Sequence, residues 1–288
     1  MDWNVHMDLM IKNVLFALLS VAALIRPVCV LGDDLTNSRV QQKHSSALDN
    51  LSEHLRGKGF SPEEMLSHPQ FEIYEDIVSF YKKAPEKKGW DTYGDAVKRG
   101  DTKEAERLFN QEFTRYRRHI GLDKKKETIT KFIEEHAEQL ELVEESYGIP
   151  REIIAAVIGM ESHFGKITGR HYAVNVYVSM YVVNYRKKFA LSQLEELLRF
   201  SEKNGLDVFT YRSSYAGAIG YMQFLPYSLN RWFVGNNVFD MDDSITSVAN
   251  YLAHFKKRQG TVEKALYRYN PSKLYVSAVL ELADYARL

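Results

Sequence analysis

The stretch from Pro150 to Gly165 most constrains the fold, because it reads as an apolar helix with a marked beginning and end. Pro150 suits the first helical position, and Gly165 can take the left-handed conformation that ends many helices. Three- and four-residue spacing puts Ile154, Val157 and Glu161 on one face of that helix. The sequence therefore predicts a buried helix with a carboxylate on its apolar face, close to its C-terminal end.

This placement predicts an unusual carboxyl group at Glu161. Partial burial and the negative end of a helix both disfavour the charged form of a carboxylate, so we expect a raised pKa. A carboxyl group that keeps its proton near neutral pH can act as a general acid. The alternative is that Glu161 lies at the edge of the apolar face and reaches water.

The remaining pattern predicts an all-α fold. Tyr172 to Tyr185 is rich in Val and Tyr, which favour strands, but its helical surroundings favour a helix. Leu122 to Tyr147 reads as one long amphipathic helix whose charged residues face water. Asp242 or Asp243 is expected to cap a later helix, and Asn270 with Pro271 to open the last one.

The N-terminal residues read as an export signal. Val14 to Ile25 is apolar but too short to span a bilayer comfortably, which predicts a signal peptide over residues 1–32 and a periplasmic protein. A lipoprotein acylated at Cys29 is an alternative, although the preceding Arg-Pro-Val is a poor lead-in. Residues 33–46 are polar, so we expect a flexible linker there.

Composition excludes several function classes. The 38 Lys and Arg residues balance 38 Asp and Glu residues, which argues against a nucleic-acid partner. The nine histidines show no metal-ligand spacing, and the glycines form no nucleotide-binding motif. We therefore expect no metal and no cofactor.

Three further stretches carry polar and aromatic side chains suited to a sugar ligand. They are Phe113–Arg118, which is basic and aromatic, Ser213–Pro226, which is rich in glycine, and Tyr267–Tyr275. Glycines let a backbone approach a ligand closely, and Ser, Tyr and Gln supply donors and acceptors for hydroxyl and amide groups. Each stretch alone is equally consistent with a solvated face, a packed helix junction or a helix cap.

Together these stretches resemble the lytic murein transglycosylase B family, whose members cleave the glycan strands of bacterial peptidoglycan. The resemblance covers roughly Leu48 to the C-terminus, and its pieces occur in the family's order. They are Arg115–Arg118, Glu161–Gly165, Ser214–Ala218 with Gly220, Gln223, Phe224 and Pro226, Ser247–Tyr251, Tyr269–Asn270 and Tyr275. The resemblance implies a lysozyme-like helical catalytic domain over residues 47–288, with additional N-terminal helices (47–147) and a core (148–288).

The resemblance also implies a reaction. Glu161 would protonate the oxygen between N-acetylmuramic acid and N-acetylglucosamine and then, as a base, deprotonate the muramic C6 hydroxyl, which leaves a 1,6-anhydro end. The positions that match substrate-binding residues of the family are Tyr116, Ser214, Tyr215, Gln223, Phe224, Tyr269, Asn270 and Tyr275. The expected partner is the peptidoglycan glycan strand, bound by a monomer, and other cell-wall enzymes are candidate partners.

Two departures and two alternatives remain open. Gly235–Ser244 is short and lacks the spacing of the calcium loop that the family often carries, so we expect no calcium. Tyr185–Lys188 departs from the family's Tyr-Pro-Arg-Arg, which puts stem-peptide contacts in doubt. A hydrolytic muramidase on the same fold, or an inactive glycan-binding protein of the cell envelope, would fit the same stretches.

Overall fold

The computed structural model describes residues 33–82 and 92–288, and helices dominate both ranges. The expected all-α class is therefore confirmed for this part of the chain. The described residues form two compact units, each built from two separate segments. One unit holds residues 92–167 and 233–288, and the other holds residues 33–82 and 168–232.

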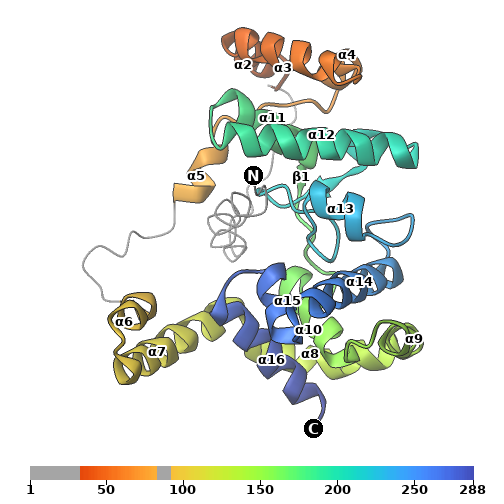
Figure 1. Cartoon of the computed structure of the whole chain (residues 1–288). Coiled ribbons are helices and arrows are strands. Elements are labelled where there is room, and N and C mark those ends of the chain that lie inside the picture. Colours follow the sequence, from red (N-terminus) through yellow and green to blue (C-terminus); the bar gives the residue numbers. More distant parts are fainter. Residues whose placement is uncertain (1–32, 83–91) are drawn as a thin grey trace. The chain divides into compact units, whose positions relative to one another are not determined.

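The core of the first unit consists of helices packed around α10. Figure 1 shows α8, α14, α15 and α16 gathered around this helix, and α10 contacts α8, α9, α14 and α16 directly. Its helices are α6 (Tyr93–Arg99), α7 (Thr102–Ile120), α8 (Leu122–Glu135), α9 (Ala137–Tyr147), α10 (Arg151–Ser162), α14 (Met241–Gln259), α15 (Val262–Tyr269) and α16 (Lys273–Ala286).

The second unit pairs two helices, α11 and α12, which lie side by side in Figure 1. A short antiparallel ladder joins His171 to Ser213 and Tyr172 to Arg212. The elements are α2 (Asp33–Lys43), α3 (Ser45–Gly57), α4 (Pro62–Ser67), α5 (Ile77–Lys82), β1 (His171–Tyr172), α11 (Ala173–Val182), α12 (Lys187–Asn204), η1 (Val208–Thr210), β2 (Arg212–Ser213) and α13 (Pro226–Trp232).

Helix α11 shows burial overriding local propensity. Every residue from Ala173 to Val182 is buried, although valine and tyrosine favour strands. A helix satisfies its backbone hydrogen bonds internally, and the neighbouring helices cover its apolar side chains. The expected helix over Tyr172–Tyr185 is confirmed, with ends a few residues further in.

The two units differ from the predicted domain division. We expected N-terminal helices over 47–147 and a core over 148–288, whereas the first unit holds a segment that runs across residue 148 (92–167) together with residues 233–288. The chain leaves the first unit after Ile167 and returns at Phe233, so sequence order does not separate the units.

The N-terminal expectations have mixed outcomes. The predicted linker over 33–46 is wrong, because Asp33–Lys43 forms α2. The Asn37 amide donates to the Phe71 carbonyl oxygen at 2.7 Å and Lys43 pairs with Glu75, which explains why this polar segment is ordered. The signal peptide over 1–32 and Cys29 lie outside the described residues. Among the helices that are described, none has the length and apolar character needed to cross a membrane.

Three predicted helix boundaries are wrong. The helix expected over Leu122–Tyr147 breaks at His136, whose φ of −119° lies outside the helical region, giving α8 and α9. Asp240, not Asp242 or Asp243, caps α14 by accepting from the Asp243 amide. The last helix, α16, is capped by Ser272, while Asn270 ends α15.

Candidate active site

Helix α10 brings Glu161 to the end of the most deeply buried element of the first unit. All residues from Ile153 to Met160 are buried, and Glu161 follows them as the penultimate residue of the helix. Pro150 is the N-cap rather than the first helical residue. The predicted position of Glu161 near the C-terminal end of a buried helix is correct.

The chain turns sharply just after Glu161. His163, Phe164 and Gly165 have φ values of 53°, 57° and 81°, so the left-handed conformation starts two residues before the glycine that we expected to end the helix. This conformation is costly for His and Phe. The Ser162 hydroxyl accepts from the Gly165 amide at 3.0 Å, and the Ser162 carbonyl accepts from the Ile167 amide at 2.9 Å. These bonds hold the turn.

The turn also depends on a glycine inside α10. A Cβ added at Gly159 would lie 2.5 Å from the Phe164 ring, so the ring packs directly on the helix backbone. Phe132 of α8 also packs on Phe164, with the ring centroids 5.1 Å apart. The turn that follows Glu161 is thus fixed by packing against two helices.

The carboxyl group of Glu161 is held by Tyr275 of α16. The Tyr275 hydroxyl donates to Glu161 Oε1 at 2.7 Å. Glu161 keeps some exposed surface, but its carboxyl end lies among protein atoms, and this burial raises its pKa to about 7. The Tyr275 hydrogen bond and the charge of Lys125 act in the opposite direction. At neutral pH a large fraction of Glu161 therefore retains its proton.

Two more tyrosines predicted for the site accompany Glu161 in this unit. Burial, together with the negative charge of Glu161, raises the pKa of Tyr116 on α7 and that of Tyr269 at the end of α15. The Tyr116 hydroxyl is buried without a hydrogen-bond partner among the described residues. Tyr269 packs edge-on against Tyr251 of α14, which we did not predict as a site residue.

Asn270 also carries a buried polar atom. It is 4% exposed, and its side-chain oxygen has no hydrogen-bond partner in the part of the chain that the structure describes. Buried polar atoms nearly always form hydrogen bonds, so one without a partner in the protein is expected to bind a ligand or a water molecule. Asn270 directly follows Tyr269, and we expected both to bind substrate.

Lys125 of α8 is the residue that sequence reasoning missed most clearly. It belongs to the charge run that we expected to face water, yet it is only 2% exposed. Its Nζ donates to the Gly159 carbonyl oxygen at 2.8 Å and lies 2.5 Å from His163 Nδ1. Burial lowers its pKa to about 8, and the charge of Glu161 opposes that shift.

The predicted residues Ser214, Tyr215, Gln223 and Phe224 lie together in the second unit, in the loop after β2. Ser214 forms a tight turn: its carbonyl accepts from the Gly217 amide at 2.9 Å, and its hydroxyl accepts from the Ala218 amide at 3.3 Å.

Gly217 is needed at this turn because its φ is 82°, and a Cβ there would lie 2.3 Å from the Tyr177 ring. The Tyr177 hydroxyl donates to the Gly217 carbonyl oxygen at 2.8 Å. At Gly217, the missing side chain lets the backbone pack against the Tyr177 ring and leaves no open space for a ligand.

The second half of the loop folds back on the first. Ile219 and Phe224 exchange two backbone hydrogen bonds of 2.8 and 3.0 Å. Gln223 has a left-handed φ of 49°, and its side-chain amide donates to the Gly220 carbonyl at 2.9 Å. Tyr215 and Phe224 are 7% and 3% exposed, whereas Gln223 keeps a larger exposed surface. The polar Gln223 is thus the most accessible of the four predicted residues after the loop folds.

Gly235–Ser244, where the resembled family often binds calcium, is organised by one carboxylate. Asp243 accepts from the Asn236 and Asn237 amides at 2.9 Å each. A Cβ on Gly235 would collide with that carboxylate, so glycine is required there. The described residues contain no cluster of three or more His, Cys, Asp or Glu side chains suited to a metal ion.

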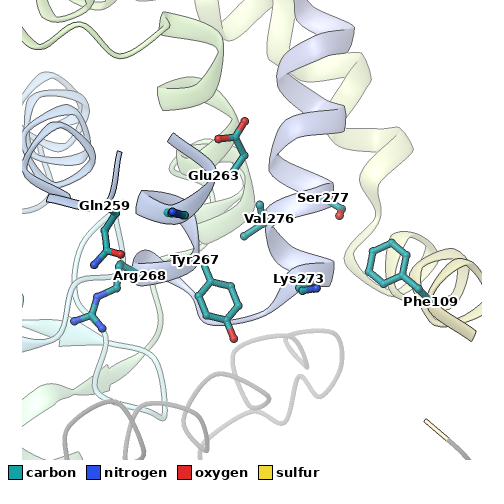
Figure 2. A pocket seen from close by; sticks show the side chains of 9 residues that line it. Phe109, Gln259, Glu263, Tyr267, Arg268, Lys273, Val276 and Ser277 are labelled. Atoms are coloured by element: carbon teal, nitrogen blue, oxygen red, sulfur yellow. The ribbon is translucent and has the colours of Figure 1, made fainter. Parts of the chain in front are cut away.

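A cavity of about 490 Å³ lies elsewhere in the first unit, and Glu161 is not among its lining residues. Figure 2 shows Tyr267 and Arg268 on α15, with Val276 and Ser277 on the neighbouring α16. The lining carries three cations, Lys264, Arg268 and Lys273, and one carboxylate, Glu263; Phe109 and Gln259 complete it. Glu161, Tyr116 and Tyr275 are therefore not part of its lining.

Comparisons with known proteins identify the family of this chain. A model of the family described as Transglycosylase SLT domain matches residues 43–264. Membrane-bound lytic murein transglycosylase B of Escherichia coli (strain K12) is 30% identical over 150 residues. The aligned region makes up 49% of this chain and 41% of that protein, so the match spans less than half the length of this relative.

Solved structures show the same fold. The soluble lytic transglycosylase SltB1 from Pseudomonas aeruginosa superposes with a TM-score of 0.67 at 20% identity, covering 84% of this chain and 98% of that one. The Escherichia coli lytic transglycosylase Slt35 in complex with calcium gives 0.65 at 18% identity, with coverage of 85% and 92%.

SltB3 from Pseudomonas aeruginosa, in complex with NAG-NAM-pentapeptide, gives a TM-score of 0.67 at 16% identity, covering 85% of this chain and 79% of that one. The expected lysozyme-like helical fold is thus confirmed by its likeness to solved lytic transglycosylases. Because the family model matches well over half of the sequence, the chain belongs to the Transglycosylase SLT domain family.

Proposed function

We propose that this protein is a peptidoglycan lytic transglycosylase. It cleaves the β-1,4 bond between N-acetylmuramic acid and N-acetylglucosamine and forms 1,6-anhydro-muramic ends. Family membership and the relative named lytic murein transglycosylase B support this assignment. The single observation that carries it is the Glu161 carboxyl group, with a pKa raised to about 7 and a 2.7 Å hydrogen bond from Tyr275.

Glu161 acts twice in the proposed reaction. Its protonated carboxyl first gives a proton to the glycosidic oxygen, and the bond from that oxygen to muramic C1 breaks. The resulting carboxylate then takes the proton of the C6 hydroxyl while O6 bonds to C1. The proton returns to Glu161, so the residue ends as it began and no water is consumed.

The surroundings of Glu161 suit both steps. Burial favours the protonated form that the first step needs. The Tyr275 hydroxyl donates to the carboxylate that the first step produces, and a hydrogen bond to a charged group is worth roughly 1.5–3 kcal/mol. One group can thus serve as acid and as base at the same pH.

A mechanism with one carboxylate is supported by the charges around Glu161. Ordinary glycosidases flank the scissile bond with two carboxyl groups. Among the described residues, the side chains that shift the pKa of Glu161 are Tyr275 and Lys125, and no carboxylate is among them. The muramic C6 hydroxyl replaces the water that a second carboxylate would activate.

The substrate-binding roles are part of the same proposal. The buried polar atoms of Tyr116 and Asn270, which find no partner among the described residues, offer hydrogen bonds to sugar hydroxyl or acetamido groups. Tyr269 and Tyr275 are the other proposed substrate-binding residues of the unit that holds Glu161, and the Tyr275 hydroxyl donates to the Glu161 carboxyl group. In the second unit the proposed substrate-binding residues are Ser214, Tyr215, Gln223 and Phe224, of which Gln223 is the most exposed.

We also propose that the protein works in the cell envelope as a monomer. Peptidoglycan lies there, and the apolar segment Val14–Ile25 resembles a secretion signal. Cleavage of the signal in the periplasm, without acylation of Cys29, is the proposed route, and other cell-wall enzymes are candidate partners.

The test compares two glutamates of the same helix. Glu161→Gln removes the proton donor with little change in shape, so the release of soluble fragments from purified sacculi should fall by at least about 10²-fold. Glu152→Gln is the matched control, because Glu152 lies in the first turn of α10 and pairs with Arg151 and Arg287, so it should cleave normally. Near-normal release by Glu161→Gln would remove Glu161 from the mechanism, and no release by the unmodified protein would refute the enzyme assignment in favour of a glycan-binding protein.

A further inference from the structure

Lys125 is a buried cation that forms an ion pair with none of the carboxylates in the described ranges. It is 2% exposed, and its ammonium group is met by the Gly159 carbonyl oxygen and the His163 ring. The next residue, Lys126, behaves in the ordinary way, pairing with Glu281 at 2.7 Å. The two neighbouring lysines therefore have different environments.

Burying an unpaired ammonium group is expensive, so proteins rarely keep one without a reason. A structural role alone would be met by a neutral side chain of similar shape, because the packing of α8 against α10 does not need a charge. The charge itself calls for an explanation.

The positions of the two groups that Lys125 contacts, on Gly159 and His163, explain why the charge is kept. Gly159 lies two residues before Glu161 and His163 lies two residues after it, so Lys125 holds the chain on both sides of the glutamate. The His163 ring accepts a hydrogen bond from the Lys125 ammonium group at Nδ1, which requires a neutral imidazole. Burial lowers the pKa of His163, as does the charge of Lys125, and both favour that neutral form.

We propose that Lys125 is a positioning residue for Glu161, which fixes the last turn of α10 and supplies a fixed positive charge that stabilises the ionised carboxylate between the two reaction steps. This proposal rests on the proposed function for its catalytic consequence. Its structural content, the contacts of Lys125 with Gly159 and His163 on either side of Glu161, stands on the geometry of the first unit alone.

The other ionisable groups on the helices around Glu161 include neutral tyrosines and carboxylates that are paired elsewhere. Tyr116 of α7, Tyr269 of α15 and Tyr275 of α16 are neutral at physiological pH, and burial raises the pKa of each still further above its ordinary value. Tyr251 of α14 contacts Tyr269. The carboxylates that α9 brings to α10, Glu141 and Glu144, pair with Arg151 at the opposite end of the helix. Among the described side chains, Lys125 is therefore the positively charged one whose charge shifts the pKa of Glu161.

The first test is the pH dependence of Lys125→Met, which keeps the length and apolar stem of the side chain and removes the charge. Loss of a nearby opposite charge favours the protonated carboxyl, so the basic limb of kcat/KM should move to higher pH by about one unit. In the same variant kcat should fall about tenfold, because the carboxylate between the two steps is less stable, while KM changes little. Lys126→Met is the matched control and should leave the limb in place.

A merely structural role gives a different result. In that case Lys125→Met would lower the melting temperature and the fraction of folded protein but would leave the basic limb of the folded enzyme unmoved. That outcome would overturn the proposal.

The second test needs neither activity nor a folded Lys125 variant. The coupling between two ionisable groups is reciprocal, so removing the charge of Glu161 must shift the titration of Lys125 as well. In Glu161→Gln, the side-chain nitrogen of Lys125, followed by nitrogen-15 NMR, should titrate at lower pH than in the unmodified protein. An identical titration midpoint in both proteins would refute the coupling.

The two tests separate the possible failures. If the unmodified protein fails to cleave sacculi but Glu161→Gln shifts the Lys125 titration, the proposed function is wrong and the coupling stands. If sacculi are cleaved but neither the Lys125 titration nor the basic limb moves, the inference about Lys125 is wrong and the proposed function stands.

Discussion

At the scale of the residue, the proposed function depends on a carboxyl group that the fold keeps partly protonated. Burial raises the pKa of Glu161 to about 7, from an ordinary value of 4.5. The unfolded chain has no such environment, so it releases the proton at lower pH than the folded protein does. The arrangement that prepares Glu161 for proton donation must therefore cost stability as the pH rises.

This cost is measurable against Glu161→Gln, which has no charge to bury. As the pH rises from about 4.5 to about 7, the unfolded state loses its proton and the folded state keeps it, so the free energy of unfolding of the unmodified protein should fall relative to the variant. The total change should approach roughly 3 kcal/mol and then level off, since one pKa unit corresponds to about 1.4 kcal/mol. Urea unfolding at several pH values measures it, and a difference independent of pH would contradict the raised pKa.

The hydrogen bond from Tyr275 gives a second prediction at this scale. In Tyr275→Phe the carboxylate loses a donor at 2.7 Å, so its pKa should rise further and the rate of cleavage should fall roughly 10- to 100-fold. The basic limb of the pH–rate profile should move upward. Tyr285→Phe is the matched control, because Tyr285 lies on the same helix and is 43% exposed, and its hydroxyl should be dispensable. Equal loss of activity in both variants would exclude a specific role for the Tyr275 hydroxyl.

The environment of Glu161 could be predicted from the sequence, whereas that of Lys125 could not. Helical spacing places Glu161 on an apolar face, and the structure agrees. Lys125 looks from sequence like any member of a lysine run on an amphipathic helix. Its burial depends on α10 packing against α8 and on the turn that presents His163, which local sequence does not encode.

At the scale of the element, α10 and its left-handed turn act together. The turn keeps two non-glycine residues in a costly conformation, and the contact between Gly159 and the Phe164 ring supports it. The position of Glu161 thus depends on a glycine two residues earlier in its own helix.

A methyl group at Gly159 should therefore disturb the site. In Gly159→Ala the new Cβ would lie 2.5 Å from the Phe164 ring, so the turn must move, and overpacking of this kind costs about 1–3 kcal/mol. We expect a lower melting temperature and weaker cleavage. Gly57→Ala, where nothing lies within 4 Å of the new Cβ, is the control and should change neither. A melting temperature for Gly159→Ala at or above that of the unmodified protein would show that Phe164 is not packed as described.

Helix ends were the least predictable feature of the elements. Asp240 caps α14 although two later aspartates have the same chemistry, because the chain enters the helix earlier than its pattern suggests. His136 interrupts a continuous apolar pattern, which local periodicity cannot reveal because the pattern continues on both sides of the break. Apolar periodicity predicts which segments form helices, whereas tertiary packing determines the residues at which those helices begin and end.

At the scale of the whole molecule, the chain crosses between its two units and returns. Residues 168–232 belong to the second unit and separate α10 from α14, although both of these helices pack in the first unit. The predicted boundary at residue 148 followed sequence order, so it could not anticipate this interleaving. The all-α class could be predicted because the pattern of each segment is helical on its own.

The central claim is that Glu161 makes muramic O6, rather than water, attack C1. Mass spectrometry of the fragments released from purified sacculi in water enriched with heavy oxygen tests it most directly. We expect fragments that end in 1,6-anhydro-muramic acid, each lighter by one water than a reducing fragment, with no heavy oxygen incorporated, and none of them from Glu161→Gln. Reducing ends that carry heavy oxygen would identify a hydrolytic muramidase and contradict this claim.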